Sequence, residues 1–399
     1  MTRCRAIALA WGMLVLTAVG QQNPGAVFLE IWPSARSTAL AGAMTALADD
    51  ADAAYWNPGG LGFQKGLGLN GNVFNWLPGL YPGMYYLYGS GGYGIRDFPF
   101  HGANFNIGLN NTYLTTGKTE VTGSNGEPLG EYTTFDDAFG LHAGLALGDK
   151  IGVGVNLKYI YSFLVPDWVW QMLPELGITS GGTGQTVALD VGALFKSVKP
   201  VSIGVMLANA GPNIAYTSSG ESDPLPWMLR LGLCYAPVDM AFPGVSPDMR
   251  LARLRLIAEM DKVLVGMFYD PTHNRTLGQS LQYELWKAWK SLGVEATVLG
   301  ILSLRAGYFE DVIGARGGFV VDRGDGSSIH VGLFDYVSGH ARGKLTSIGL
   351  CAGVGLGWKD YVRLELSSDG LIYDFPTSNI KVALTVNNLG GFLRELGYR

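Results

Sequence analysis

Charged side chains are scarce in this chain: Lys, Arg, Asp and Glu together make up 15% of its 399 residues, and the formal net charge is −5. No basic stripe is visible, so the composition argues against nucleic acid as a partner. Beyond Met1–Gly20, no apolar run approaches the ~18–20 residues that a membrane helix needs. The sequence therefore predicts neither a nucleic-acid surface nor a helical membrane span.

Residues that carry catalytic or metal chemistry are also few. There are 3 cysteines and 5 histidines, and no histidine pairs with Cys or Glu at the spacing of a metal site. Cys234 and Cys351 stand in apolar or small-residue runs, which favours buried free thiols, although the compartment of an exported chain would allow one disulfide. Gly89–Gly94 lacks the Lys and helix of a phosphate loop, and Asp136–Asp137 is typical of a turn before a strand. We expect no enzyme, no cofactor and no metal site.

The first residues have the features of a secretory signal peptide. Arg3 and Arg5 precede the apolar run Ile7–Val19, which is too short to span a bilayer, and Ala18 and Gly20 are small residues before a cleavage point. We therefore expect residues 1–20 to be removed and the mature chain to be exported.

Glycine and aromatic residues are abundant, with 58 glycines and 12% aromatics. In an exported chain without membrane helices, this composition points to an outer-membrane β-barrel. Lys150–Ser162 shows the alternation that such a strand needs, because successive side chains of a strand point to opposite faces. One face holds Ile151, Val153, Val155, Leu157, Tyr159 and Tyr161, and the other holds Gly152, Gly154, Asn156 and Lys158 until Ile160 breaks the rule.

About fourteen segments of this kind recur, each about ten residues long, which is the length of a tilted spanning strand. They are GLGLNGNVF, ANFNIGLN, AFGLHAGLAL, KIGVGVNLKYIYS, TVALDVGALF, VSIGVMLAN, WMLRLGLCYAP, RLRLIAEMD, SLGVEATV, ILSLRAGYF, SIHVGLFDYV, TSIGLCAGVGLGW, YVRLELSS and NIKVALTVNN. Glycine on the less apolar face leaves room inside a closed barrel for a plug or a lumen. The alternative is a soluble β-sandwich with glycine at bulges. We predict an all-β fold, an antiparallel transmembrane β-barrel of about fourteen strands with a short helical N-terminal plug.

Three stretches interrupt the alternation, and we expect them to be extracellular loops. They are Trp76–Phe100, Phe163–Gly184 and Asp270–Lys290. The second half of the last stretch has the pattern of an amphipathic helix, with Leu281, Leu285 and Trp289 on one side. The apolar content of these loops predicts contact with lipid or a partner protein, or packing of the loops on one another as a lid.

The stretch Ala48–Gly62, ADDADAAYWNPGGLG, raises the choice between an ion site and a structural turn. A calcium loop spreads its oxygen ligands over about twelve residues and closes with a Glu, which this stretch lacks. Asp49, Asp50 and Asp52 instead favour a helix cap or turn, because their side chains compete for backbone hydrogen bonds.

The residues on either side of these acids predict a compact N-terminal segment. Ser37–Ala48 is rich in alanine and predicts a helix of small side chains. A second helical turn is expected near Asp52–Trp56, and Asn57–Pro58 predicts a tight turn into the first strand. We expect residues 21–64 to form a plug inside the barrel or across its periplasmic mouth, and residues 65–399 to form the barrel.

Charged residues on the less apolar strand faces are expected to point into the lumen, because a charge on the lipid face costs ~2–4 kcal/mol near the bilayer midplane. The candidates are Arg230, Arg253, Arg255, Glu259, Asp261 and Arg305. They predict an internal salt-bridge network that braces barrel and plug. The alternative is a role in ligand binding.

The N-terminal stretch resembles the opening of the PorV/PorQ-type outer-membrane proteins, which are related to the FadL-like transporters. The matching residues are Ala35, Arg36, Ala48, Asp49, Asp50, Tyr55, Trp56, Asn57, Pro58, Gly60 and Leu61. Gly59 replaces the usual Ala, and Pro33–Ser34 departs from the usual Gly lead-in. The resemblance continues in Thr119–Ser162, Leu225–Pro237 and Ser291–Asp311, and so covers most of the mature chain.

This resemblance implies a fourteen-stranded plugged barrel in the outer membrane of a Gram-negative-type bacterium. For PorV-type members it implies a role in type IX secretion, where the barrel receives exported proteins and partners a surface sortase. For FadL-like relatives it implies diffusion of hydrophobic small molecules. We expect the secretion role and keep the FadL-like channel as the alternative, with outer-membrane lipid as a partner in both.

The resemblance also marks a plug and turn motif as the candidate site. Its residues are Arg36, Asp49, Asp50, Tyr55, Trp56, Asn57, Pro58 and Gly60. One departure from the family pattern concerns the C-terminus. NIKVALTVNNLG continues into GFLRELGYR, so the sequence does not fix which residues form the last strand.

Overall fold

The computed structural model describes residues 24–79, 83–123, 125–172, 180–217, 222–241, 250–268, 275–359, 361–371 and 379–397. The predicted signal peptide, residues 1–20, lies outside these ranges. Across the described ranges, no helix combines the length and the apolar character needed to cross a membrane.

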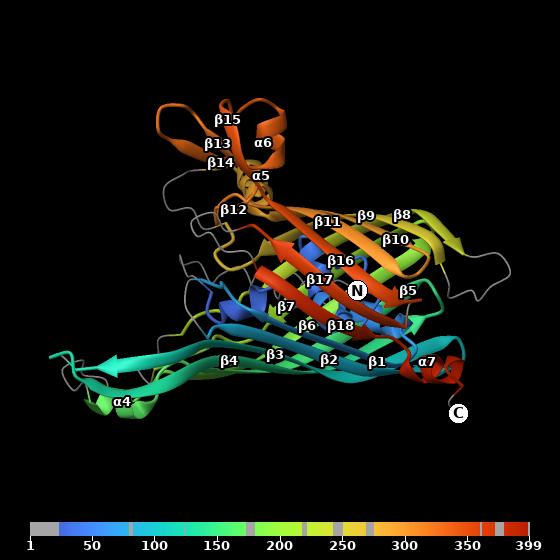
Figure 1. Ribbon diagram of the computed structural model, residues 1–399, viewed down its shortest axis with the longest axis horizontal. Coiled ribbons are helices and arrows are strands. Elements are labelled where there is room, and N and C mark those ends of the chain that lie inside the picture. Colours follow the sequence, from blue (N-terminus) through green and yellow to red (C-terminus); the bar gives the residue numbers. More distant parts are fainter. Residues whose placement is uncertain are drawn as a thin grey trace, which may run out of the picture.

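Fourteen antiparallel strands close into a barrel (Figure 1). The strands are β1 Gly66–Asn75, β2 Tyr85–Arg96, β3 Ala103–Thr122, β4 Pro128–Leu147, β5 Ile151–Phe163, β6 Thr183–Val198, β7 Val201–Ala210, β8 Met228–Ala241, β9 Arg250–Val263, β10 Trp289–Val298, β11 Leu302–Asp311, β16 Leu350–Trp358, β17 Val362–Asp369 and β18 Asn379–Val386. Each strand pairs with the barrel strand that follows it, and β1 pairs with β18 to close the ring. The predicted fold class is confirmed.

The outer wall is apolar, as the alternation predicts. On β5, Val153 and Leu157 are 45% and 53% exposed, whereas Asn156 is 1% exposed and faces inward. Ile160, which breaks the alternation, is fully buried in a core cluster inside the barrel. Because the apolar faces point outward instead of packing against each other, the soluble-sandwich alternative is wrong. An outward apolar belt around a closed barrel is the surface that lipid covers.

The two ends of the barrel differ. Short turns such as residues 148–150, 199–200 and 299–301 join strands at one end, here called the short-turn end. The opposite, long-loop end carries α4 Asp167–Met172 and α5 Leu277–Lys287, and there the β3–β4 hairpin extends past the other strands (Figure 1). After the last strand, β18, the chain forms α7 Leu389–Glu395 at the short-turn end.

Two of the segment predictions are wrong. Trp76–Phe100 is not simply a loop, because it contains barrel strand β2. Aromatic residues lie on both faces of β2, with Tyr86 fully buried and Tyr93 56% exposed, so its sequence shows no alternation of polarity. SIHVGLFDYV, Ser328–Val337, is not a spanning strand: it forms β14 Ser328–Val331 and α6 Leu333–Val337 outside the barrel.

These two elements belong to a side module, Arg316–Ile348, that stands off the barrel at the long-loop end (Figure 1). The module also contains β12 Arg316–Gly317, β13 Phe319–Asp322 and β15 Lys344–Ile348, and its sheet has the order β14-β13-β15. The predicted segment TSIGLCAGVGLGW is therefore divided between β15 of this module and β16 of the barrel.

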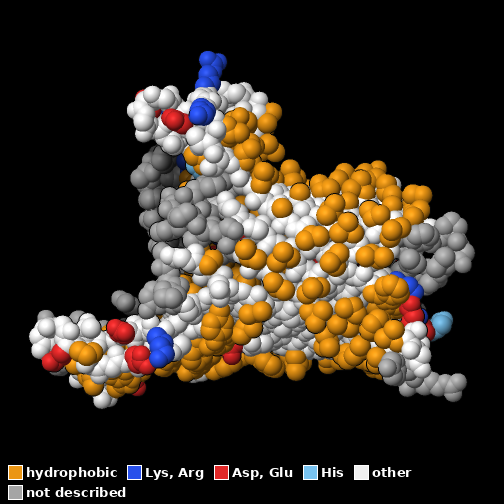
Figure 2. All heavy atoms as spheres, viewed as in Figure 1, with side chains coloured by type: hydrophobic (Ala, Val, Ile, Leu, Met, Phe, Trp, Pro, Cys, Tyr) orange, Lys and Arg blue, Asp and Glu red, His pale blue; other side chains and the backbone are white. Residues whose placement is uncertain are grey.

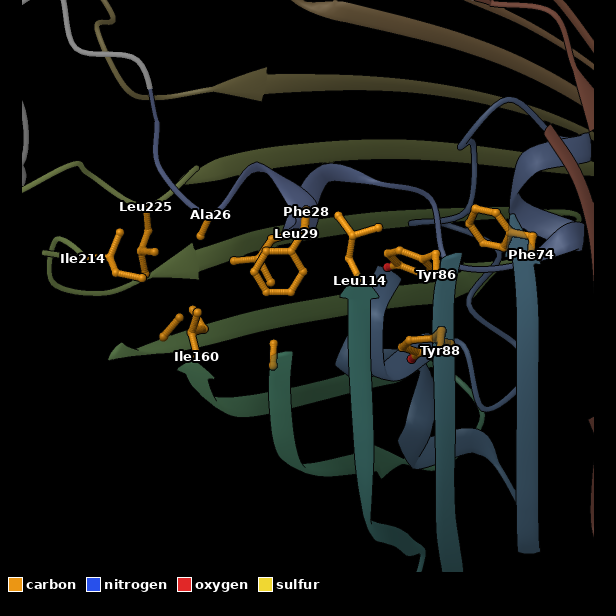
Figure 3. Packing of buried hydrophobic residues seen from close by; sticks show 12 residues of the cluster. Ala26, Phe28, Leu29, Phe74, Tyr86, Tyr88, Leu114, Ile160, Ile214 and Leu225 are labelled. Carbon is orange, nitrogen blue, oxygen red and sulfur yellow. The ribbon is translucent and has the colours of Figure 1, made fainter. Parts of the chain in front are cut away.

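The N-terminal segment lies inside the barrel. It contains η1 Val27–Glu30, α2 Ala35–Ala39, α3 Ala53–Trp56 and η2 Pro58–Phe63. The helix predicted over Ser37–Ala48 is wrong in extent, because the chain leaves the helical conformation at Ala41 (φ 56°) and Gly42 (φ 84°). Figure 3 shows Phe28 and Leu29 of this segment packed beside wall residues Leu114 and Tyr86. We call residues 24–63 the plug.

Glycines on the inner faces of the strands let the plug approach the wall closely. A Cβ at Gly307 would lie 2.6 Å from the backbone nitrogen of Ala41, and one at Gly232 would lie 2.7 Å from that of Ala46. At Gly204 an added Cβ would meet the carbonyl oxygen of Thr45. The predicted role of inward glycine, to leave room for a plug, is confirmed at these positions.

Candidate functional site

The Asn57–Pro58 turn fixes the second half of the plug. The Asn57 side chain accepts a hydrogen bond from Gly59 N at 3.0 Å and donates to Thr45 O at 2.8 Å and to Ala193 O on β6 at 2.9 Å. Pro58 begins η2, where its missing N–H leaves no hydrogen bond unmade. Gly60 has no room for a Cβ against Ala48. This turn therefore joins two parts of the plug to each other and to the wall.

Tyr55 and Trp56 fill the space beside this turn. The Tyr55 hydroxyl donates to Leu29 O at 2.8 Å, and Trp56 is fully buried. The Arg230 guanidinium lies over the Trp56 ring, 4.5 Å from its centroid. These aromatic residues link the beginning of the plug, its end and strand β8.

Arg36 connects the plug to the wall through ion pairs. It is 1% exposed, and its Nη1 lies 2.6 Å from Asp49 Oδ1 and 2.6 Å from Asp50 Oδ2. On its other side, Nε and Nη2 donate to the two carboxylate oxygens of Glu295 on β10, at 3.0 and 3.1 Å. One side chain of the plug is thereby held by two acids of the plug and one acid of the wall.

Three wall arginines extend this arrangement. Arg255 lies 2.9 Å from Asp49 and 2.8 Å from Glu295. Arg305 pairs with Glu295 at 2.7 Å and with Glu365 at 2.9 Å, and Arg363 pairs with Asp50 at 2.7 Å. We call Arg36, Asp49, Asp50, Arg255, Glu295, Arg305, Arg363 and Glu365 the arginine–carboxylate network. Its four arginines balance its four carboxylates, so these buried charges are compensated.

The other predicted lumen charges also lie on the inner faces of strands. Glu259 accepts hydrogen bonds from Thr45 N at 2.7 Å and from Thr45 Oγ1 at 2.6 Å. Arg230 lies 3.7 Å from Asp261, and Arg253 pairs with Asp239 at 3.3 Å near the short-turn end. Glu259 and Arg230 contact the plug directly, at Thr45 and at the carbonyl oxygen of Tyr55.

The interpretation of the three plug acids as caps and turn residues needs correction. Asp50 Oδ1 does accept a turn hydrogen bond from Asp52 N at 3.1 Å, but its other oxygen holds Arg36. Asp52 precedes α3 without a capping hydrogen bond from its side chain. Asp49 and Asp50 are ion-pair partners first, because an arginine carried inside the barrel must have buried acids beside it.

Sequence reasoning missed three wall residues of the network, two acids and one arginine. Glu295, Arg363 and Glu365 lie opposite apolar faces in SLGVEATV and YVRLELSS, the same signal that identifies Arg255 and Arg305. Lys158 and Asp190, which pair inside the barrel at 2.8 Å, carry this signal too. In the part of the chain that the structure describes, no group of His, Cys, Asp and Glu could hold a metal ion, and Cys234 and Cys351 are buried free thiols.

An apolar pocket of about 270 Å³ lies between the beginning of the plug and the wall, toward the long-loop end. Its aromatic and aliphatic lining is Phe28, Ile31, Trp32, Trp76, Leu114, Trp289, Phe309 and Leu371. Trp32 and Phe309 meet edge to face, with ring centroids 4.9 Å apart. The pocket is larger than the ~150 Å³ apolar cavity that binds benzene in an engineered protein.

A few ionisable groups enter this apolar lining, including Glu30, Arg316 and Lys381. Glu30 belongs to the plug, outside the spanning strands. Burial raises the pKa of Glu30 to about 7, and the positive charge of Arg316 opposes that rise. Its carboxyl group therefore changes charge close to neutral pH.

A second cavity, of about 290 Å³, lies at the other end of the plug and is polar. Lys65, Arg253, Arg255 and Arg363 line it together with Asp49. Between the two cavities lies the middle of the plug, and Asp49, Arg255 and Arg363 of the network line the second cavity. The lumen thus contains an apolar pocket, a filled middle and a polar cavity.

No protein-family model matches this chain, and no curated protein matches it. Several solved structures are similar to it in fold. The toluene transporter TbuX of Ralstonia pickettii is 12% identical, with 90% of this chain and 99% of that chain covered and a TM-score of 0.49. The toluene transporter TodX of Pseudomonas putida is 13% identical, with coverage of 88% and 97% and a TM-score of 0.42.

A FadL homologue of Pseudomonas aeruginosa is 11% identical, with coverage of 89% and 98% and a TM-score of 0.43. The FadL-like part of the resemblance is consistent with these structures, whereas its PorV/PorQ part has no support among them. At these identities the likeness concerns the barrel fold alone.

Proposed function

We propose that this chain is a plugged outer-membrane channel through which small hydrophobic compounds enter, and that it works by diffusion, without catalysis or a cofactor. The apolar belt supports a place in the membrane. Because outer-membrane barrels have short periplasmic turns and longer extracellular loops, the long-loop end faces outward. The apolar pocket then lies on the side from which compounds arrive.

The apolar pocket is the observation that carries this proposal. A hydrophobic molecule that leaves water for such a lining gains about 25 cal/mol for each Å² of apolar surface that it buries. Aromatic rings such as Trp32, Trp289 and Phe309 also offer edges and faces to an aromatic ligand. Small hydrophobic compounds, and aromatic ones in particular, fit both the volume and the lining.

The plug determines how such a compound passes through the lumen of the barrel. The network and the Asn57 turn hold the plug against the wall, so the lumen is closed to free flow of ions in the resting state. A bound compound reaches the polar cavity when the plug segment beside the pocket yields. The polar cavity at the periplasmic end then favours release, because charged side chains line it and it offers less apolar surface to the compound than the pocket does.

A role in protein secretion, with a sortase-like or other surface protein as partner, stays a prediction of the PorV/PorQ resemblance. The pocket favours the small-molecule channel over it, because a buried site of this volume suits a small ligand and not a folded protein.

A pair of matched variants on one strand tests the proposed pocket. Leu114 on β3 lines the pocket, and Leu109 on the same strand is 49% exposed on the outer wall. We expect Leu114→Trp to fill the pocket and weaken binding of the fluorescent probe 1-aminoanthracene at least several-fold. Leu109→Trp keeps wild-type affinity.

Probe fluorescence on purified protein measures this binding, with toluene as the competitor. Equal thermal unfolding of the two variants shows that both are folded. Equal affinity in both variants, or no displacement by toluene, would contradict the proposal.

A further inference from the structure

Helix α5 packs against the barrel with its polar side. Glu284 is 6% exposed and lies 2.5 Å from Lys262 on β9 and 2.8 Å from Lys287. Its carboxylate also accepts a hydrogen bond from Phe268 N at 3.1 Å. The apolar stripe of the helix lies outside this contact: Leu277, Leu281 and Leu285 are 74%, 47% and 54% exposed. A helix on a water-soluble surface has the opposite arrangement, with its apolar stripe inward.

The side module presents a second apolar surface next to this stripe. Phe334 and Val337 on α6 are 79% and 75% exposed. The module is nevertheless held in place: the Tyr336 ring stacks on Phe319 with centroids 4.3 Å apart, and Phe319 lies 5.5 Å from Tyr308 on β11. The module is therefore fixed to the barrel, and loose attachment does not account for the exposure of Phe334 and Val337.

Hydrogen bonds connect α5, α6 and the barrel wall into one surface. Trp286 Nε1 on α5 donates to Asp335 Oδ2 on α6 at 3.3 Å. Leu333 N donates to Glu310 Oε2 on β11 at 2.6 Å. These hydrogen bonds hold the side module and α5 in fixed positions relative to the barrel.

A cleft of about 360 Å³ separates this surface from the outside of the barrel. On one side it is lined by Leu285, Trp286, Leu333 and Phe334, and on the other by Leu292 and Tyr308 of the outer wall. Leu292 on β10 is 45% exposed and belongs to the apolar belt. The cleft is therefore continuous with the surface that lipid covers.

The placement of the module points the same way. In Figure 1 the barrel strands run roughly from left to right, and the module stands to one side of the barrel at the long-loop end. A membrane around the belt would end at this level. Figure 2 shows hydrophobic atoms on the side of the module that faces the hydrophobic barrel wall. This side of the module faces the apolar belt of the barrel.

We propose that α5 and the side module form a lipid-binding surface that overhangs the outer leaflet, with an acyl chain of an outer-leaflet lipid in the cleft. The continuity with the belt selects lipid as the occupant over a second copy of this chain or another protein. The proposal needs a barrel that spans a membrane, but it is independent of what passes through the lumen.

Quenching by brominated lipid tests this proposal on the full chain in phospholipid nanodiscs. Single cysteines are placed at Phe334, at Leu350 on the belt as a positive control and at Asp325 in the β13–β14 turn as a negative control, and each is labelled with bimane. The native Cys234 and Cys351 are buried. Because Phe334 is 79% exposed, Phe334→Cys removes little packing.

We expect phospholipids brominated in the acyl chain to quench the label at Phe334→Cys at least twofold more than that at Asp325→Cys, approaching the quenching at Leu350→Cys. Equal quenching at Phe334→Cys and Asp325→Cys would overturn the proposal. The proposal would also be overturned if the label at Phe334→Cys were shielded from water only in nanodiscs that contain two copies of the chain. The occupant of the surface would then be a second copy.

Discussion

At the residue scale, Arg36 explains how a plug stays inside a barrel. Its guanidinium reaches Asp49 and Asp50 within the plug and Glu295 on the wall, and all of these groups are largely withdrawn from water. Two charges taken out of water stabilise a fold only when each is fully compensated. The network meets that condition because every arginine in it has a carboxylate within hydrogen-bond distance.

Glu295 is the most sensitive position of the network, since Arg36, Arg255 and Arg305 all bind it. We expect Glu295→Gln to leave these buried arginines undercompensated and to destabilise the plugged state by about 3–5 kcal/mol. A lower thermal unfolding midpoint and a higher ion conductance in planar bilayers measure the effect. Glu127→Gln, at the exposed tip of the β3–β4 hairpin, is the control. Wild-type stability and conductance in Glu295→Gln would show that the network does not hold the plug.

Glu30 makes ligand binding depend on pH. Burial raises the pKa of Glu30 to about 7, and a neutral hydrophobic ligand prefers the uncharged carboxyl beside it. We therefore expect affinity to be highest below pH 7 and to fall as the pH rises through that value, with a Glu30→Gln variant showing a flatter profile. Titration of 1-aminoanthracene binding over this range measures it. The same slope in both proteins would assign the pH dependence to another group.

At the scale of elements, small residues on the inner strand faces let the plug contact the wall backbone to backbone. Gly204 on β7 is a sharp example, because an added Cβ would meet the carbonyl oxygen of Thr45. On β1, by contrast, a Cβ at Gly71 would find nothing within 4 Å. Close contact with the plug therefore requires glycine at position 204 but not at position 71, although both residues lie in strands.

Gly204→Val is expected to push the plug away from β7 and to destabilise its seating by about 1–3 kcal/mol, the usual range for overpacking. Hydrogen exchange of the plug amides, measured by mass spectrometry, reports the loosening as faster exchange over residues 41–48. Gly71→Val provides the comparison on an open site. Unchanged exchange in Gly204→Val would mean that the plug does not contact this strand in the membrane.

The elements also show where sequence reasoning works and where it stops. Alternation predicts a strand such as β5, because one face meets lipid and the other meets a polar interior. It fails for β2, where Tyr86 and Tyr88 pack into an apolar region inside the barrel while Tyr85 and Tyr93 face outward. It also misassigns SIHVGLFDYV, since a small sheet and helix outside the barrel show the same short pattern as a spanning strand.

At the scale of the whole molecule, the chain separates two environments. Its outer wall is apolar around the ring, whereas its interior holds the buried charges of the network, apolar clusters of plug and wall residues, and the pocket at the long-loop end. The sequence predicts this division, because it requires only the period of the strands. It does not predict which charges meet: Arg36 and Glu295 are 259 positions apart, and only closure of the barrel brings them together.

The apolar pocket was also beyond sequence reasoning, for the same physical reason. Its lining comes from the plug, from β3, β10 and β11, and from the residues around β17 and β18. The plug contributes Val27, Phe28, Ile31 and Trp32, and β3, β10 and β11 contribute one apolar side chain each, unremarkable in its own segment. Their meeting depends on where the plug enters the ring, which no local pattern specifies.

Uptake of a neutral aromatic hydrocarbon by intact cells tests the channel most directly, because a lipopolysaccharide outer membrane slows passive entry. Radiolabelled toluene is supplied to cells that produce the wild-type chain, the pocket-filling variant Leu114→Trp or the outer-wall control Leu109→Trp at equal levels. We expect faster uptake with the wild type and Leu109→Trp than with cells lacking the chain, and a loss of that gain with Leu114→Trp. Uptake that is the same with and without the chain would contradict it.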